Sequence, residues 1–106
     1  MSDPIYKIMP QTDWAAALAA GVYTGSADDI RDGFIHFSTR EQVPGTLAMH
    51  FASQQDLVLV AVDPAKLGSA LIWEPSRGGA LFPHFYGDLP AEAAVSVDAI
   101  SGSTGD

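Results

Sequence analysis

Cysteine is absent from the 106-residue chain, so neither a disulfide nor a zinc site with cysteine ligands can support its fold. Basic residues are scarce as well, since five lysines and arginines stand against thirteen acidic residues, for a net charge of −8. Nucleic acids and anionic membranes are bound by clustered Lys and Arg side chains. We therefore expect neither partner, and we expect the acidity to serve solubility.

Long apolar runs are also missing. The two longest, "WAAALAA" and "LVLVAV", fall far short of the roughly 20 residues that span a bilayer. The N-terminal "MSDPIYKIM" has no positively charged region followed by an apolar one, so we expect no secretory signal. These features predict a cytoplasmic protein.

The familiar catalytic and phosphate-binding motifs do not occur. The chain has no G-x-x-x-x-G-K or G-x-G-x-x-G loop and no G-x-S-x-G turn. Its histidines, His36, His50 and His84, lack the close spacing of a metal pair on a helix, and we expect no metal site. The less favoured alternative is a site assembled from histidines and carboxylates in three dimensions.

What is present predicts an α+β domain over residues 1–100, followed by a disordered tail over residues 101–106. At 47%, apolar residues suffice for a hydrophobic core. Alternating or continuous apolar segments predict strands, and spacings of three and four predict helices. The expected strands are 4–9, 33–38, 56–63, 70–74, 80–87 and 93–100, and the expected helices are 12–21 and 44–53.

Several details of these elements can be tested. Thr12 or Asp13 should cap the first helix, and the turn-rich segment 22–33 should be a surface loop. Either Ser38 with Glu41 or Thr39 with Gln42 should cap the second helical region. That helix should bury a stripe of Val43, Leu47 and Phe51. Segment 80–87 contains Pro83 and should lie at a sheet edge. In strand 93–100, Ala93, Val95, Val97 and Ala99 should face inward.

Segment "DGFIHFST" carries the first candidate site. By alternation, Ile35 and Phe37 share an apolar core face, whereas Phe34, His36 and Ser38 share a mixed face. His36 is either a histidine satisfied by backbone within the sheet or a side chain that lines a cleft.

Segment "WEPSRGGALFPHFYG" carries the second candidate site. It gathers Trp73, Glu74, Arg77, His84 and Tyr86 among glycines and prolines, where functional loops are common. Glu74 is either a surface residue that ends an apolar strand or a cleft acid. His84 and Tyr86 alternate onto one face with Phe82, which forms either an aromatic wall for a planar ligand or a corner of the core.

Together these segments resemble a known family. The motifs "IYKI", "W…A…G.Y", "DGFIHFST.EQV" and "WE.S…FPH.YG.L", from Ile5 to about Leu89, are similar to the small bacterial family called domain of unknown function 952. The resemblance implies an ADP-ribosyltransferase-like fold, in which two small mixed β-sheets with two short helices form a cleft that holds NAD. NAD would then be a substrate rather than a resident cofactor.

The resemblance also implies roles for particular residues. Lys7 would occupy a position on the first strand that touches a ribose, where a histidine is expected. Ser38 and Thr39 would lie near the nicotinamide, and Glu74 would stabilise the ribosyl cation as nicotinamide leaves. His36 and His84 have no counterpart in the general pattern.

Combining residues and resemblance gives one candidate site. Its catalytic residues are Glu74, His36 and His84, with the histidines acting as hydrogen-bond partners or bases. Its ligand-binding residues are Lys7, Ser38, Thr39, Trp73, Arg77 and Tyr86. The leading hypothesis is an enzyme that binds NAD or a related nucleotide and transfers or hydrolyses an ADP-ribosyl group. The alternatives are a non-catalytic small-molecule-binding domain and a metal-independent enzyme acting on an unrelated small substrate.

The tail provides the first test. Residues 101–106 ("SGSTGD") offer no apolar face to bury, so their deletion should change the free energy of unfolding by less than about 1 kcal/mol. Urea denaturation of the full and shortened chains measures this difference. A larger loss would show that the tail docks on the domain.

Overall fold

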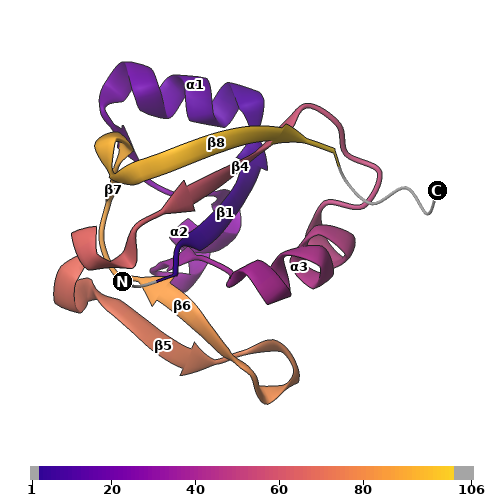
Figure 1. Cartoon of the computed structure of the whole chain (residues 1–106), viewed down its shortest axis with the longest axis vertical. Helices are drawn as coiled ribbons and strands as arrows, with labels where there is room; N and C mark the ends of the chain where they lie inside the picture. Colours follow the sequence, from indigo (N-terminus) through magenta and orange to yellow (C-terminus); the bar gives the residue numbers. More distant parts are fainter. Residues whose placement is uncertain (1–2, 102–106) are drawn as a thin grey trace.

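The structure is a computed structural model that describes residues 3–101, apart from the side chain of Arg77. It is an α+β fold, as predicted, and it contains several small antiparallel sheets and few helices. The described residues form three α-helices, eight strands and several 3₁₀ turns (Figure 1). Residues 102–106, most of the predicted tail, lie outside the described range.

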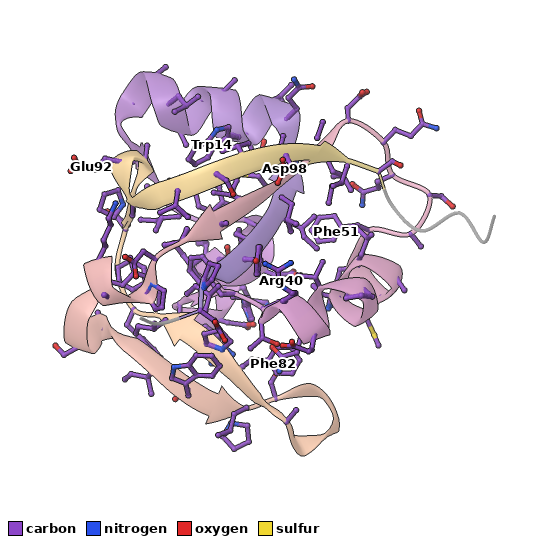
Figure 2. All side chains as sticks on the ribbon, viewed as in Figure 1. Trp14, Arg40, Phe51, Phe82, Glu92 and Asp98 are labelled. Atoms are coloured by element: carbon purple, nitrogen blue, oxygen red, sulfur yellow. The ribbon has the colours of Figure 1, made fainter. Side chains whose placement is uncertain are left out.

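The first sheet has the order β1–β4–β8 and is wholly antiparallel. Its strands are β1 (Ile5–Pro10), β4 (Leu57–Val62) and β8 (Ala94–Ile100). The central strand β4 is almost fully buried, as its continuous apolar sequence predicts. Helix α1 (Gln11–Ala20) lies along one side of this sheet and points Trp14 towards it (Figures 1 and 2).

The second three-stranded sheet has the order β3–β6–β5. Its strands are β3 (Ile35–His36), β6 (Leu81–Phe85) and β5 (Leu71–Pro75), and the β5–β6 hairpin projects away from α1 (Figure 1). Two backbone hydrogen bonds join the two sheets, because Tyr6 and Ser38 each donate to the carbonyl of the other at 2.8 Å. This bridge fixes the end of β1 beside the segment that carries His36.

The smaller elements complete the chain. Strands β2 (Val22–Tyr23) and β7 (Leu89–Pro90) pair with each other. Helix α2 spans Ala27–Asp32, and helix α3 spans Val43–His50. The 3₁₀ turns are Arg40–Gln42, Pro64–Lys66, Gly68–Ala70, Arg77–Gly79 and Ala91–Ala93. None of the helices in residues 3–101 is long and apolar enough to cross a membrane.

The structure differs from the predicted sheet plan. Three antiparallel sheets replace the two mixed sheets, and three α-helices replace the two expected. The additional helix, α2, lies in segment 22–33, which the sequence predicted to be a loop. A capping box begins it, because the Ser26 side chain accepts from the Asp29 N–H and the Asp29 carboxylate accepts from the Ser26 N–H. Because α2 is short and acidic, its sequence has no apolar stripe, and the segment was therefore predicted to be a loop.

The helix ends were partly predicted. Helix α1 begins after Pro10 without a side-chain cap, so the expected cap by Thr12 or Asp13 is wrong. Thr39 and Gln42 form the capping box of the Arg40–Gln42 turn, which is one of the two registers expected, and α3 follows.

The apolar faces of α3 and β8 are less buried than predicted. Val43, Leu47 and Phe51 are only half-buried, because α3 lies at the margin of a cavity rather than across the core. Val97 lies opposite the buried Val60, on the core face that alternation predicts, yet Val97 is 40% exposed. The reason is that β8 is an edge strand, whereas α1 packs mainly against β1, β2 and β4.

The predicted edge position of segment 80–87 is wrong, because β6 is the central strand of its sheet. The sheet tolerates Pro83 there because the paired residues of β3 stop at His36. One residue further on, Phe37 donates to the Pro83 carbonyl at 3.0 Å, and Pro83 has no N–H with which to return the bond.

The predicted core face of the "DGFIHFST" segment is confirmed, since Ile35 and Phe37 are both almost completely buried. Phe37→Ala should therefore lower the free energy of unfolding by about 3–5 kcal/mol, the cost of a large core cavity. The matched control is Leu81→Ala, because Leu81 is largely exposed and its truncation should cost less than about 0.5 kcal/mol. Chemical denaturation compares the two, and equal losses would contradict the assignment of faces.

Candidate functional site

A cavity of about 420 Å³ lies between α2, α3 and the ends of β1, β3 and β6. We call it the histidine cavity, because His36, His50 and His84 all line it. Lys7, Asp29 and Ser38 are among its other polar lining residues. The structure thus brings together residues from six separate segments of the chain.

Asp29 of α2 is the most heavily bonded side chain in this cavity. Its two carboxylate oxygens lie 2.9 and 3.1 Å from the Lys7 ammonium. It also accepts from the backbone N–H groups of Ser26 and His36, at 2.9 and 3.1 Å. The His36 Nδ1 lies 2.6 Å away. Asp29 therefore ties α2 to both β1 and β3.

The charges of this buried pair are set by competing effects. Burial acts on the Asp29 pKa most strongly and would raise it, but the hydrogen bond from His36 and the charge of Lys7 together hold that pKa well below its usual range. Burial lowers the pKa of the Lys7 ammonium, and Asp29 opposes that shift. The pair is an ion pair largely removed from water, and each charge depends on the other.

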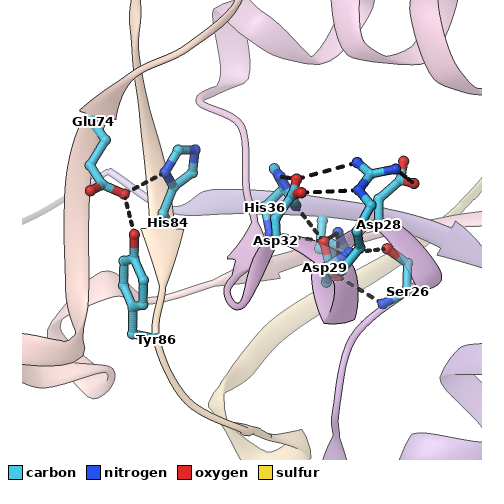
Figure 3. A network of polar contacts seen from close by, with 10 residues as sticks. Ser26, Asp28, Asp29, Asp32, His36, Glu74, His84 and Tyr86 are labelled. Carbon is cyan, nitrogen blue, oxygen red and sulfur yellow. Dashed lines mark hydrogen bonds and ion pairs between the residues drawn. The ribbon is translucent and has the colours of Figure 1, made fainter.

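His36 is held between two carboxylates of α2. Its Nδ1 faces Asp29, and its Nε2 lies 3.0 Å from Asp32 Oδ2 (Figure 3). Since both nitrogens are engaged, His36 fastens α2 to β3 and has no nitrogen left for a ligand.

His84 of β6 has a different environment. Its Nδ1 lies 2.7 Å from Glu74 Oε1 on the neighbouring strand β5, and the Tyr86 hydroxyl donates to the same oxygen at 2.7 Å (Figure 3). The hydrogen bonds from His84 and Tyr86 lower the Glu74 pKa, and the one to Glu74 raises the Tyr86 pKa. Glu74 is therefore a carboxylate that fixes the orientation of the imidazole.

The other nitrogen of His84 is unsatisfied. The side chain is 5% exposed, and its Nε2 has no hydrogen-bond partner among the residues that the structure describes. Phe34 stacks on the ring with centroids 4.0 Å apart, and the His36 ring centroid lies 5.5 Å away. Glu74, which holds Nδ1, is not among the residues that line the cavity, whereas His84 is. A buried polar atom without a partner is rare and suggests a ligand or a chemical role.

The structure places the predicted site residues in three groups. Lys7, His36, Ser38 and His84 line the histidine cavity, and Ser38 Oγ lies 2.9 Å from Thr46 Oγ1 on α3. Glu74 and Tyr86 are not among the residues that line this cavity, but Glu74 is bonded to His84 and Tyr86 is bonded to Glu74. Thr39 and Trp73 line a second cavity, and Thr39 also caps the Arg40–Gln42 turn. The Arg77 side chain is not described.

Sequence reasoning missed the acidic side of the cavity. Asp28, Asp29, Asp32 and Arg31 of α2 all line it. Arg31 pairs with Asp28 at 3.1 Å and with Asp32 at 3.0 Å. The available signal was Ser26-x-x-Asp29, a cap pattern with Asp in place of Glu. The described residues contain no group of histidines and carboxylates arranged to hold a metal ion.

The arrangement offers one imidazole suited to acid–base chemistry. An oriented histidine with a carboxylate on Nδ1 and a free Nε2 can accept or donate a proton at a bound ligand. Phe34 stacks on its ring and would shield it from water, and Phe82 of the cavity wall offers an aromatic surface for a planar group. The fold and site thus define a small α+β protein with a cavity lined by histidine, lysine and aspartate side chains.

Comparison with known proteins identifies the family. Residues 8–97 match the family described as protein of unknown function (DUF952), and the chain belongs to this family. The contacts of His36 and His84 with their carboxylate partners therefore lie within the matched region. Of the buried ion pair, Asp29 lies within it and Lys7 lies one residue before it.

Two solved structures of one bacterial protein are similar to this chain. The crystal structure of protein CC0527 from Caulobacter crescentus is 47% identical, covers 91% of this chain and 84% of its own, and superposes with a TM-score of 0.88. The solution NMR structure of CC0527 is 46% identical over 92% of this chain and 84% of its own, with a TM-score of 0.83. No curated protein matches the sequence.

The buried ion pair yields a test by mutation and pH. Asp29→Asn should lower the free energy of unfolding at pH 7 by about 3–5 kcal/mol, because Lys7 is left buried without its counter-charge. The folded-state pKa of Asp29 is depressed, so the stability that its carboxylate contributes is present above the unfolded pKa of about 3.9. That contribution is lost as the pH falls below this value.

The difference between wild type and Asp29→Asn should therefore be largest near neutral pH and shrink in acid. Denaturant unfolding at a series of pH values measures it. Asp28→Asn is the control, because Asp28 is exposed and its ion pair, with Arg31, is also exposed, so its change should stay within about 0.5 kcal/mol. A pH-independent difference for Asp29→Asn would contradict the ion-pair account.

Proposed function

We propose that the histidine cavity binds NAD or a related nucleotide, and that the protein transfers or hydrolyses an ADP-ribosyl group. The observation that carries this proposal is His84, a buried imidazole with its Nδ1 fixed by Glu74 and its Nε2 free of any described partner. The sequence motifs resemble domain of unknown function 952, and the ADP-ribosyltransferase-like fold which that resemblance implies supplies the substrate class. Small antiparallel sheets around a cavity are compatible with this proposal.

The charge of the cavity supports a ligand part that is positive or neutral. The cavity wall contains one lysine, Lys7, and one described arginine, Arg31. Each is already paired with a carboxylate. Among the side chains that the structure describes, the cavity therefore has no unpaired lysine or arginine for a pyrophosphate. It suits the nicotinamide–ribose end of NAD, whose ring is cationic and whose ribose becomes cationic as the ring leaves.

In this proposal His84 acts as the general base. The bond between the nicotinamide nitrogen and the ribose carbon breaks, and the bond to the acceptor oxygen forms. His84 Nε2 takes the proton from that acceptor, which is water in hydrolysis or a hydroxyl group in transfer. Glu74 positions the imidazole through its Nδ1, and the Tyr86 hydroxyl donates to Glu74. Glu74 is thereby assigned to orientation rather than to direct contact with the ribosyl cation, the role that the resemblance implied.

A second candidate function has its own supporting observation. Lys7 occupies the position where the resemblance leads us to expect a histidine, and it is buried in an ion pair with Asp29. A lysine held in this way cannot supply an imidazole hydrogen bond to a ribose. This favours a non-catalytic domain that keeps the cavity and binds a small molecule without turnover.

The two functions are separated by measuring NAD binding by calorimetry and nicotinamide release by chromatography. For the enzyme, His84→Gln should reduce kcat by about 10²–10⁴-fold with binding little changed, and Glu74→Gln should reduce it less. Glu92→Gln is the matched carboxylate control, because Glu92 lies outside the cavity, beside β7 and β8 (Figure 2). NAD binding without nicotinamide release would establish the second function, and absence of NAD binding would refute both NAD-based roles.

A further inference from the structure

A second cavity, of about 490 Å³, is lined by residues from the start of β1, the Arg40–Gln42 turn and β5, and it belongs to no function proposed above. We call it the tryptophan cavity. Tyr6, Arg40 and Trp73 line it, together with the acidic residues Asp3 and Glu41. Tyr6 lines both cavities, so the same strand β1 forms a wall of each.

The tryptophan cavity has an aromatic surface that the fold does not need. Trp14, the other tryptophan, is buried in the core, whereas Trp73 of β5 is 44% exposed at the wall of this cavity. An exposed indole next to a hollow offers a large, rigid stacking surface for a planar ring. Trp73 contributes little to the core, so its packing does not account for its presence here.

The same cavity has a cation that is free to bind a ligand. Of the cationic side chains that line either cavity, Lys7 and Arg31 have carboxylate partners, whereas Arg40 makes no ion pair with any carboxylate in the described part of the chain. Its guanidinium lies 5.6 Å from the centroid of the Tyr6 ring. This contact with the ring face holds the guanidinium at the wall while its N–H donors stay available for a carboxylate.

The charges that surround Arg40 restrict the ligand further. Asp3 and Glu41 also line the cavity, so its three charged residues sum to a net charge of −1. A polyphosphate would be repelled by the two carboxylates. A ligand that carries one carboxylate and one ammonium group would satisfy both signs of charge.

We propose that the tryptophan cavity is a binding site for an aromatic zwitterion, the chemistry of a free aromatic amino acid. The ring stacks on Trp73, the carboxylate pairs with Arg40, and the ammonium group faces Asp3 and Glu41. This site is independent of NAD binding in the histidine cavity, and neither its presence nor its loss bears on the role of His84.

The test uses L-phenylalanine as the probe and the full chain, with calorimetry and ¹⁵N-resolved NMR. Phenylalanine should bind with one-to-one stoichiometry and shift the indole N–H signal of Trp73 but not that of Trp14. Phenethylamine, which lacks the carboxylate, and 3-phenylpropionate, which lacks the ammonium group, should each bind roughly tenfold more weakly.

Two variants assign the contacts. Arg40→Gln should weaken phenylalanine binding roughly tenfold but leave phenethylamine binding unchanged, because that ligand has no carboxylate to lose. Trp73→Ala should weaken both ligands. Arg31→Gln is the control, since it removes an arginine from the histidine cavity and should leave phenylalanine binding unchanged. Absence of phenylalanine binding to the wild type, or equal weakening by Arg40→Gln and Arg31→Gln, would overturn the proposal.

Discussion

The ion pair between Asp29 and Lys7 is the interaction on which the rest of the site depends. A buried carboxylate and ammonium lose their hydration on folding, and only close pairing with further hydrogen bonds can compensate for this. Asp29 meets that requirement with bonds to a side chain on β1, to the backbone and ring of His36, and to the N-terminus of its own helix. Because these partners come from different elements, satisfying one charge places α2, β1 and β3 together.

The same pairing of histidine with carboxylate occurs twice in the site, with different consequences. At His36, carboxylates occupy both ring nitrogens, and the imidazole is part of the framework. At His84, one carboxylate occupies Nδ1, and Nε2 has no hydrogen-bond partner among the described residues. The number of carboxylates that contact the ring thus distinguishes a structural histidine from one that can act as an acid or a base.

Part of this site could be predicted from the sequence. Alternation placed His36 and Ser38 opposite Ile35 and Phe37, and it grouped His84 with Tyr86, because a strand has a fixed period of two. The same reasoning treated Asp28 to Asp32 as a surface loop. Helix α2 is too short to show an apolar stripe, and the stability of so short a helix comes from its tertiary contacts with Lys7 and His36.

The sequence by itself determined the α+β class, the strand faces and the residue types available for chemistry, since these follow from local periodicity, turn residues and composition. Only the tertiary structure decided the order of the strands, which placed Pro83 in a central strand, and the division of the predicted residues between two cavities. It also decided that Glu74 supports His84 while Asp29 holds Lys7 and His36. The physical reason is that hydrogen bonds and ion pairs depend on distances between segments, and these are fixed only when the sheets pack.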